Sequence, residues 1–537
     1  MKHFDHLYNP YETPRHTTMA RNGMVATSQP LASQAGLTIL QKGGNAIDAA
    51  IATAAALTVV EPTSNGIGGD AFALVWVKDK LYGLNGSGRS PSSLSMEELK
   101  RKGHKEIPKY GFVPVTVPGA PGTWVELSDR FGKLPFKELL APAIRYAEEG
   151  YPITPVLGKF WAMAAEKFKG TLTGEEFSHW FDTFAPNGRA PKIGEIWKSE
   201  GHADTLRKIA DSKGESFYKG ELADRIDKFS KQYDGYISKE DLADYNPEWV
   251  EPISVNYKGY DVWEIPPNGQ GIVALSALNI LKGFEFPEKE TKGTYHKQIE
   301  AMKLAFSDGE KYVADEGYMD VKAEELLDDE YASKRRKQIG EYACVPEAGT
   351  PPKGGTVYLA AADSEGNMVS FIQSNYMGFG SGLVVPGTGI ALQNRGHNFS
   401  LDPGHANALE GGKKSYHTII PGFLTKGAHP VGPFGVMGGF MQPQGHVQVA
   451  MNTIDFHLHP QAALDAPRWQ WMKEKTVWVE PHFPKHVAEA LARKGHNIEV
   501  QLESGAFGRG QIIWRDPDTG TLYGGTESRT DGTISAY

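Results

Sequence analysis

Several features are scarce in this sequence of 537 residues, and each absence excludes a class of protein. Cysteine occurs once, at Cys344, which rules out an internal disulfide. The most apolar helix-like stretch, residues 46–60, is too short to span a bilayer, so we expect no membrane partner. Lysine and arginine form no cluster and the formal net charge is −9, which argues against a nucleic-acid partner.

Targeting and linker signals are also missing. Residues 1–7 lack the basic and then apolar segments of a secretory signal, so we expect a cytoplasmic protein. The hydrophobic fraction of 40% and the charged fraction of 23% are ordinary for a soluble globular chain, and the length allows a large core. Because there is no repeat and no low-complexity linker, the sequence does not indicate separate domains on flexible joints.

The order of helix-like and strand-like segments predicts an α+β fold, layered, with an antiparallel centre. Predicted helices cover residues 28–41, 45–60, 136–149, 295–314, 445–455 and 485–494, and predicted strands cover 71–77, 81–84, 260–265, 357–362 and 368–374. Residues from about 150 to about 250 are more charged and irregular. We interpret them as a mainly helical accessory region.

The Gly355-Thr356 bond is the feature with the clearest chemical meaning. It follows a loop-like stretch, residues 346–355, with three prolines and three glycines, and it precedes a predicted β-hairpin with its turn at residues 363–367. A threonine hydroxyl is a weak nucleophile unless a base lies beside it, and the α-amine of an N-terminal threonine is one such base. A chain cut before Thr356 would carry nucleophile and base on one residue.

The dipeptide alone is weak support, since Gly122-Thr123, Gly387-Thr388 and Gly525-Thr526 also occur. Each of them is typical of a turn that enters a strand. Other motifs decide between the two interpretations. In chain order they are residues 43–50 (GGNAIDAA), 66–69 (GIGG), 117–119 (VPG), 266–267 (PP), the Thr356 hairpin, 379–382 (FGSG) and 437–439 (MGG).

This ordered set resembles the gamma-glutamyltransferase family, a branch of the N-terminal-nucleophile hydrolases. The resemblance implies a four-layer αββα sandwich, made as a precursor that cuts itself before the threonine. The two fragments, 1–355 and 356–537, would stay intertwined. It further implies that the threonine attacks a γ-glutamyl amide, forms an acyl-enzyme and passes the acyl group to water or an amine, without cofactor or metal.

The resemblance also assigns catalytic residues by position. Thr356 matches the nucleophile, and Ser374 matches a second hydroxyl residue, usually threonine, that hydrogen-bonds the nucleophile. Gly438 and Gly439 match the glycine pair whose N–H groups form the oxyanion hole, where donors must converge on developing negative charge. Arg89 matches the arginine that holds the substrate α-carboxylate through two parallel hydrogen bonds.

Other substrate positions depart from the family pattern. Where the family binds the substrate ammonium with an aspartate, an asparagine and a glutamate or glutamine, this chain has Asn398, Tyr376 and Arg395. An ammonium beside Arg395 would be repelled by a few kcal/mol at ~4 Å with an effective dielectric of about 20. We therefore expect weak use of glutathione and a preference for a dicarboxylic acyl group without an ammonium, such as glutaryl. That specificity is typical of the cephalosporin-acylase-like branch.

Two serines that help the family bind carboxylate align with His417 and Thr418. The segment between Phe399 and His417 is shorter than in members with a lid, which predicts a more open site. Lys413 and Lys414 could line its mouth, although solvated loop charge is the stronger interpretation.

Two other functional classes stay open. An unprocessed, inactive relative that only binds small molecules is one, because a family fold does not guarantee activity. A metal-dependent hydrolase is the other, because His457 and His459 could present two imidazoles, although no third ligand has suitable spacing.

Overall fold

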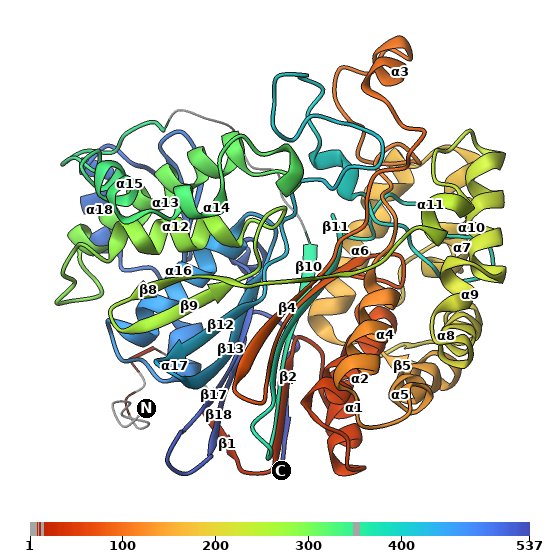
Figure 1. The fold of residues 1–537 in the computed structure, drawn as a ribbon, viewed down its shortest axis with the longest axis horizontal. Helices are drawn as coiled ribbons and strands as arrows, with labels where there is room; N and C mark the ends of the chain where they lie inside the picture. The colour runs from red at the N-terminus through yellow and green to blue at the C-terminus, as the bar shows by residue number, and fades with distance from the viewer. Residues whose placement is uncertain (1–7, 9, 12–14, 347–354) are drawn as a thin grey trace.

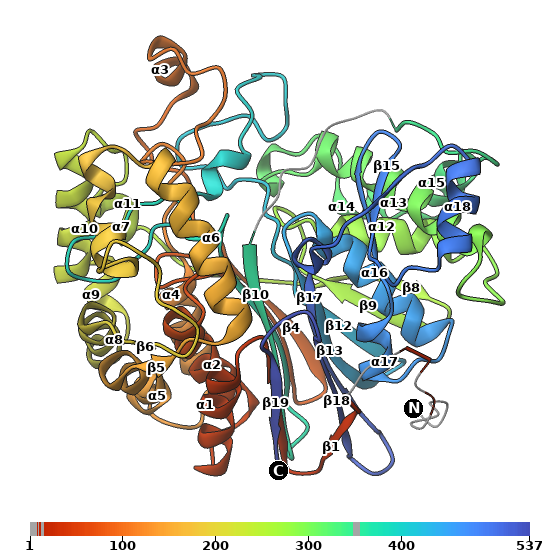
Figure 2. The ribbon, with the colours of Figure 1, turned by 180° about the vertical axis from the view of Figure 1, so that it is seen from behind.

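Two β-sheets lie face to face at the centre of the molecule, and helices cover both outer faces (Figures 1 and 2). The computed structural model describes residues 8, 10–11, 15–346 and 355–537. The predicted signal-free start, residues 1–7, and most of the predicted loop before Thr356 lie outside the described residues. Within them, no helix combines the length and the apolar character that crossing a membrane requires.

One sheet has seven strands that are antiparallel to their neighbours. Its order is β19 (Thr533–Ala536), β2 (Gly23–Thr27), β10 (Gly355–Asp363), β11 (Met368–Tyr376), β3 (Asp70–Val77), β4 (Lys80–Gly86) and β7 (Glu248–Val250). The Thr356 hairpin, β10 and β11, therefore lies between strands from the N-terminal part of the chain.

The second sheet is also seven-stranded and antiparallel. Its order is β1 (Thr18–Ala20), β18 (Leu522–Thr526), β17 (Arg509–Arg515), β13 (His429–Met437), β12 (Gly422–Lys426), β9 (Tyr260–Glu264) and β8 (Ile253–Tyr257). Both sheets thus combine strands from before and after the Gly355-Thr356 bond. Strands of the two cut pieces would pair with each other in both sheets, so the pieces could not separate without breaking both sheets.

The helices of one outer layer pack on the sheet that contains β10. They include α1 (Pro30–Gln41), α2 (Ala46–Val60), α4 (Ala120–Phe131) and α5 (Phe136–Glu149). Every residue of α2 is buried, as its alanine-rich, nearly all-apolar sequence predicts. Asn45 caps its first turn, and Asp363 of the β10–β11 hairpin accepts a hydrogen bond from the Ala46 N–H.

The other outer layer covers the second sheet. It contains α12 (Gly271–Leu281), α13 (Lys292–Tyr312), α14 (Ala323–Leu326), α15 (Asp329–Arg336), α16 (Met441–Ile454), α17 (Pro460–Asp465) and α18 (Lys485–Arg493). A small sheet of β14 (Trp469–Lys473), β15 (Thr476–Val479) and β16 (Asn497–Val500) lies beside these helices.

Three apolar cores separate the four layers. The middle core lies between the two sheets and includes Phe72, Tyr358, Ile372, Phe423 and Ile513, all fully or almost fully buried. Each of the other two cores joins one sheet to its helices. The predicted αββα sandwich is therefore confirmed.

Residues 150–250 extend the helix layer on the β10 side. They form α6 (Pro155–Thr171), α7 (Ser178–Phe184), α8 (Glu200–Ser212), α9 (Glu215–Tyr218), α10 (Glu221–Gln232), α11 (Lys239–Ala243) and the short pair β5 (Tyr151–Pro152) and β6 (Ile196–Trp197). Their aromatic side chains pack around Phe379, from the C-terminal side of Thr356, with Trp161, Trp180 and Phe184 in ring contact with it.

Candidate active site

Thr356 lies at the start of β10, beside the end of β11. The register of the two strands shifts between Gly355 and Val357, so a bulge sits at the Gly355-Thr356 bond. The Thr356 hydroxyl donates a hydrogen bond to Ser374 Oγ at 3.2 Å, and both side chains are fully buried. Ser374 Oγ also accepts the Tyr376 N–H at 2.7 Å. The structure thus brings Thr356 and Ser374 into contact, as expected from their positions in the family pattern.

Gln442 contacts the same hydroxyl, and the sequence analysis missed it. Its Nε2 donates to Thr356 Oγ1 at 3.3 Å, while its Oε1 accepts the Ile420 N–H at 3.0 Å. Because a backbone N–H must face the amide oxygen, the amide nitrogen necessarily faces Thr356. The available sequence signal for this role was a glutamine three residues after Gly439. The structure shows it buried in the first turn of α16.

Gly438 and Gly439 form the turn between β13 and α16, next to Gln442. Both have positive φ, 138° and 60°, a conformation that glycine adopts without strain. Their carbonyls accept hydrogen bonds from the first turn of α16, at 3.1 Å and 3.2 Å. Within the described residues, no hydrogen bond is donated by either glycine N–H. An oxyanion hole needs uncommitted N–H groups near the nucleophile, and this turn leads into the helix whose Gln442 contacts Thr356.

The second cluster of predicted substrate residues surrounds Arg395. Its guanidinium donates to Thr418 Oγ1 at 2.7 Å and lies 4.5 Å from the centre of the Tyr376 ring. The Tyr376 hydroxyl donates to Asn398 Oδ1 at 2.5 Å, and Asn398 Nδ2 donates to the Tyr416 carbonyl. Burial lowers the pKa of Arg395 to about 10, so its side chain is charged at neutral pH.

His417 belongs to a hydrogen-bonded pair with Asp70, a residue the sequence analysis missed. Its Nδ1 accepts the Ile419 N–H, so Nε2 carries the proton and donates to Asp70 Oδ2 at 3.0 Å. Burial, with the charge of Arg395, lowers the pKa of His417 well below its ordinary value and keeps the imidazole neutral. Burial raises the pKa of Asp70 to about 7, although Arg395 opposes that change. Asp70 directly follows the Gly68-Gly69 turn, which was the only sequence signal.

Gln270 connects the Arg395 cluster to the Gly438-Gly439 turn. Its Nε2 donates to the Thr418 carbonyl at 2.6 Å and to the Gly439 carbonyl at 2.9 Å. The two clusters are therefore parts of one buried site, with Thr356 at one end.

Arg89 stands apart from this site. Its half-exposed guanidinium forms ion pairs with Glu248 at 3.1 Å and Asp315 at 3.2 Å and donates to the Gly412 carbonyl. Among the described residues it has no contact with Thr356, Ser374 or Arg395. The expected role of Arg89 in binding the substrate carboxylate stays a prediction. In this structure its charge is already paired with two protein carboxylates.

One expectation about the mouth of the site is wrong. Lys413 and Lys414 are buried, not solvated: Lys413 donates to two loop carbonyls, and Lys414 pairs with Glu248 at 2.7 Å. Lys414 and Arg89 line a cavity of about 290 Å³. Thr356 and Arg395 are fully buried in the uncut chain, and the expectation of a more open site than in members with a lid stays a prediction.

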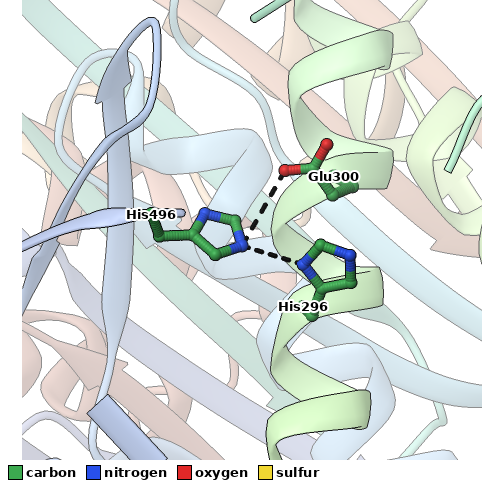
Figure 3. Close-up of side chains that lie close together, drawn as sticks. All are labelled: His296, Glu300 and His496. Carbon is green, nitrogen blue, oxygen red and sulfur yellow. Dashed lines mark hydrogen bonds and ion pairs between the residues drawn. The ribbon is translucent and has the colours of Figure 1, made fainter. Parts of the chain in front are cut away.

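A buried cluster elsewhere in the described residues has metal-ligand chemistry. His296 and Glu300 on α13 converge with His496, which directly precedes β16 (Figure 3). The two imidazoles hydrogen-bond each other at 2.8 Å, and the Lys303 ammonium pairs with Glu300 at 2.7 Å. These contacts account for the group as a hydrogen-bonded network. His459, considered above as a ligand, instead accepts the Ala462 N–H at the start of α17.

Comparison with known proteins gives one consistent result. A gamma-glutamyltranspeptidase family model matches residues 32–537. The glutathione hydrolase-like YwrD proenzyme of Bacillus subtilis (strain 168) is 37% identical over 522 residues, 95% of this chain and 97% of that protein. The oxamate amidohydrolase proenzyme of Klebsiella pneumoniae is 33% identical over 537 residues, with 97% and 99% covered.

A solved structure agrees with these sequence relatives. The crystal structure of a cephalosporin acylase from Bacillus halodurans is 69% identical, covers 99% of both chains and superposes with a TM-score of 0.96. The resemblance inferred from the motifs is confirmed. This chain belongs to the gamma-glutamyltranspeptidase family of N-terminal-nucleophile enzymes, whose members hydrolyse amides or transfer their acyl groups.

Proposed function

We propose that this chain is a self-processing amide hydrolase or acyltransferase whose nucleophile is the Thr356 hydroxyl. One observation carries the proposal: Thr356 Oγ1 is held between Ser374 and Gln442. Gln442 lies three residues after the Gly438-Gly439 turn, whose N–H groups donate no hydrogen bond within the described residues. The relatives from Bacillus subtilis and Klebsiella are named proenzymes, which supports a cut in this chain as well.

The cutting step is an acyl transfer within the chain. The Thr356 oxygen attacks the Gly355 carbonyl carbon and the C–N bond to Thr356 breaks. The nitrogen receives the proton that the hydroxyl loses and becomes a free amine. Water then hydrolyses the ester, which leaves a carboxylate on Gly355 and a free hydroxyl on Thr356. The products are fragments 1–355 and 356–537, which stay paired through both sheets.

Turnover repeats the same chemistry on a substrate. The new α-amine, with a pKa near 7.7–8.0 for such groups, takes the hydroxyl proton as Thr356 attacks a substrate amide. The amine then gives that proton to the leaving amine, and an acyl-enzyme ester remains. Water or a second amine resolves the ester and restores the hydroxyl. The Gly438 and Gly439 N–H groups stabilise the oxyanion in both steps.

For the acyl group, two residues favour a second candidate over glutathione. Asn398 replaces a carboxylate and Arg395 adds a positive charge where the family binds the substrate ammonium. Donors without an ammonium, such as a glutaryl amide, suit this site better than γ-glutamyl amides. The cephalosporin acylase with 69% identity supports that choice.

Mass spectrometry of the purified protein tests the nucleophile. We expect a small fragment that begins at Thr356, and a single uncut chain without turnover in Thr356→Ala. An uncut, inactive wild-type chain would favour the unprocessed binding relative instead. Chelator-sensitive turnover would favour a metal-dependent hydrolase. Steady-state rates on γ-glutamyl and glutaryl anilides test the acyl preference, which equal or faster γ-glutamyl turnover would exclude.

A further inference from the structure

The guanidinium of Arg395 is fixed in place but only partly used. It lies in the 3₁₀ turn η3 (Arg395–Asn398), stacks on the Tyr376 ring and is fully buried. Nη1 is its single hydrogen-bonding nitrogen, on Thr418. Nε and Nη2 are buried without a partner, and the guanidinium forms no ion pair within the described part of the chain.

The two unused nitrogens share one edge of the guanidinium. The Nε–H and one Nη2–H point in parallel, and this edge matches the two oxygens of a carboxylate. Buried Nε–H and Nη2–H groups without acceptors are destabilising, because their lost hydration is not replaced. The edge therefore has both the geometry and the energetic need for a bidentate carboxylate.

The position of this edge connects it to the nucleophile. Tyr376, on which Arg395 stacks, donates its N–H to Ser374, and Ser374 accepts from Thr356. On the other side, Thr418 is tied to the Gly439 carbonyl through Gln270. A carboxylate on Arg395 would thus lie within the site whose other end holds the hydroxyl and the oxyanion donors.

Arg89 is a poorer binding site for a substrate carboxylate than Arg395. Its guanidinium already faces Glu248 and Asp315, and Lys414 shares Glu248 with it. A substrate carboxylate would have to compete with two protein carboxylates at a half-exposed position, where ion pairs contribute little.

We propose that in the processed enzyme the Nε/Nη2 edge of Arg395 binds a carboxylate on the acyl part of the substrate, and that Arg89 does not. The substrates are then monoamides of dicarboxylic acids. This inference rests on the proposed function of Thr356, since it names the acyl group that Thr356 receives. It makes Arg395 the residue that determines acyl specificity.

Matched anilides isolate the carboxylate. Glutaryl anilide carries it, and valeryl anilide has the same chain length without it. For the wild type we expect kcat/KM on glutaryl anilide to exceed that on valeryl anilide by about 30-fold or more, as for a buried charge pair. In Arg395→Gln this ratio should fall to within about threefold, mainly through a higher KM for glutaryl anilide. Arg225→Gln, at an exposed arginine on α10, serves as the control that keeps the wild-type ratio.

Three outcomes would overturn the assignment. A wild-type enzyme that turns over both anilides equally excludes the carboxylate site. An unchanged ratio in Arg395→Gln excludes the residue. A ratio lost in Arg89→Gln but kept in Arg395→Gln returns the carboxylate to Arg89.

Two further readouts keep the test decisive. If Arg395→Gln does not fold or process, inhibition of the wild type decides: glutarate should compete with glutaryl anilide at concentrations where valerate does not, and equal inhibition refutes the site. Failure of the proposed function looks different, because an uncut chain that turns over neither anilide removes the nucleophile itself.

Discussion

Gln442→Glu is the substitution that best isolates the contact found on the nucleophile. The wild-type amide donates to Thr356 Oγ1 and accepts from the Ile420 N–H. A carboxylate keeps the acceptor for Ile420 but cannot donate to Thr356. The variant therefore removes one hydrogen bond to the hydroxyl without leaving the buried Ile420 N–H unsatisfied, which Gln442→Met would do at a cost of about 1–3 kcal/mol.

The expected loss follows from the geometry. At 3.3 Å the contact is longer than a typical N–H···O hydrogen bond, so about 1 kcal/mol is a reasonable value. That corresponds to about a fivefold slower formation of the small fragment and a similar fall in kcat/KM. The introduced carboxyl would be buried, so its pKa should be raised, and on protonation it regains a donor for Thr356.

The pH dependence makes the reasoning refutable. Acid also protonates the Thr356 amine in every variant, so the quantity to follow is the rate of Gln442→Glu divided by that of the wild type. We expect this ratio to rise as pH falls from 9 to 5, both for fragment formation in cell-free translation and for anilide turnover. Gln448→Glu, a buried glutamine on the same helix that contacts Trp469, controls for a buried carboxyl as such. A flat ratio, or a Gln442→Glu enzyme faster than wild type at pH 8, would contradict a donor role.

Other predictions concern the same site and the joint between the fragments. Ser374→Ala should slow fragment formation and kcat about tenfold through the lost hydrogen bond, whereas Ser374→Thr should stay near wild type; equal losses in both would point to packing instead. The KM for glutaryl anilide should rise as pH rises through about 7, because Asp70 ionises there and offsets the charge of Arg395, and Asp70→Asn should flatten that rise. Asp531→Ala removes hydrogen bonds from the Thr154 hydroxyl and from two N–H groups at the start of α6. Urea unfolding of the processed enzyme should therefore show a free energy of unfolding lower by about 1–2 kcal/mol. An unchanged free energy of unfolding would mean that this cap does not help to hold the fragments together.

Local patterns in the sequence predicted the elements well. The predicted helix 136–149 coincides with α5, and the Thr356 hairpin was placed within two residues at each end. The helix expected at 445–455 is wrong at its start, because α16 begins at Met441. Polar Gln442 and Gln444 hid its first turn, and both are buried by contacts with distant segments.

The sequence predicted those site residues that could be assigned by their position along the chain relative to a family motif. Ser374 was assigned from the family pattern by counting on from Thr356 without gaps, and the two residues lie at the start and near the end of one hairpin. Gln442, Gln270 and Asp70 approach the site from three separate segments, which no local pattern brings together. Lys414 shows the same limit, because its ion-pair partner Glu248 lies more than a hundred residues away in the sequence.

The structure also changes the argument about why an ammonium is disfavoured. Repulsion by Arg395 alone overstates the effect, because ionised Asp70 is buried nearby and offsets part of its charge. Asp70 is not available as a partner either, since its carboxylate already accepts from His417, Gln393 and the Gly88 and Gly119 N–H groups. An ammonium that loses its water there would therefore not gain Asp70 as a partner in exchange.

This distinction separates two comparisons that otherwise look alike. Glutaryl and γ-glutamyl groups both carry a carboxylate that Arg395 could bind, so their difference reports only on the ammonium. Glutaryl and valeryl groups differ in the carboxylate, so their difference reports on the Nε/Nη2 edge. A site with buried donors discriminates strongly against a ligand that leaves them unpaired. The glutaryl-to-valeryl ratio should therefore exceed the glutaryl-to-γ-glutamyl ratio, and the opposite order would mean that charge repulsion, not the open edge of Arg395, sets the specificity.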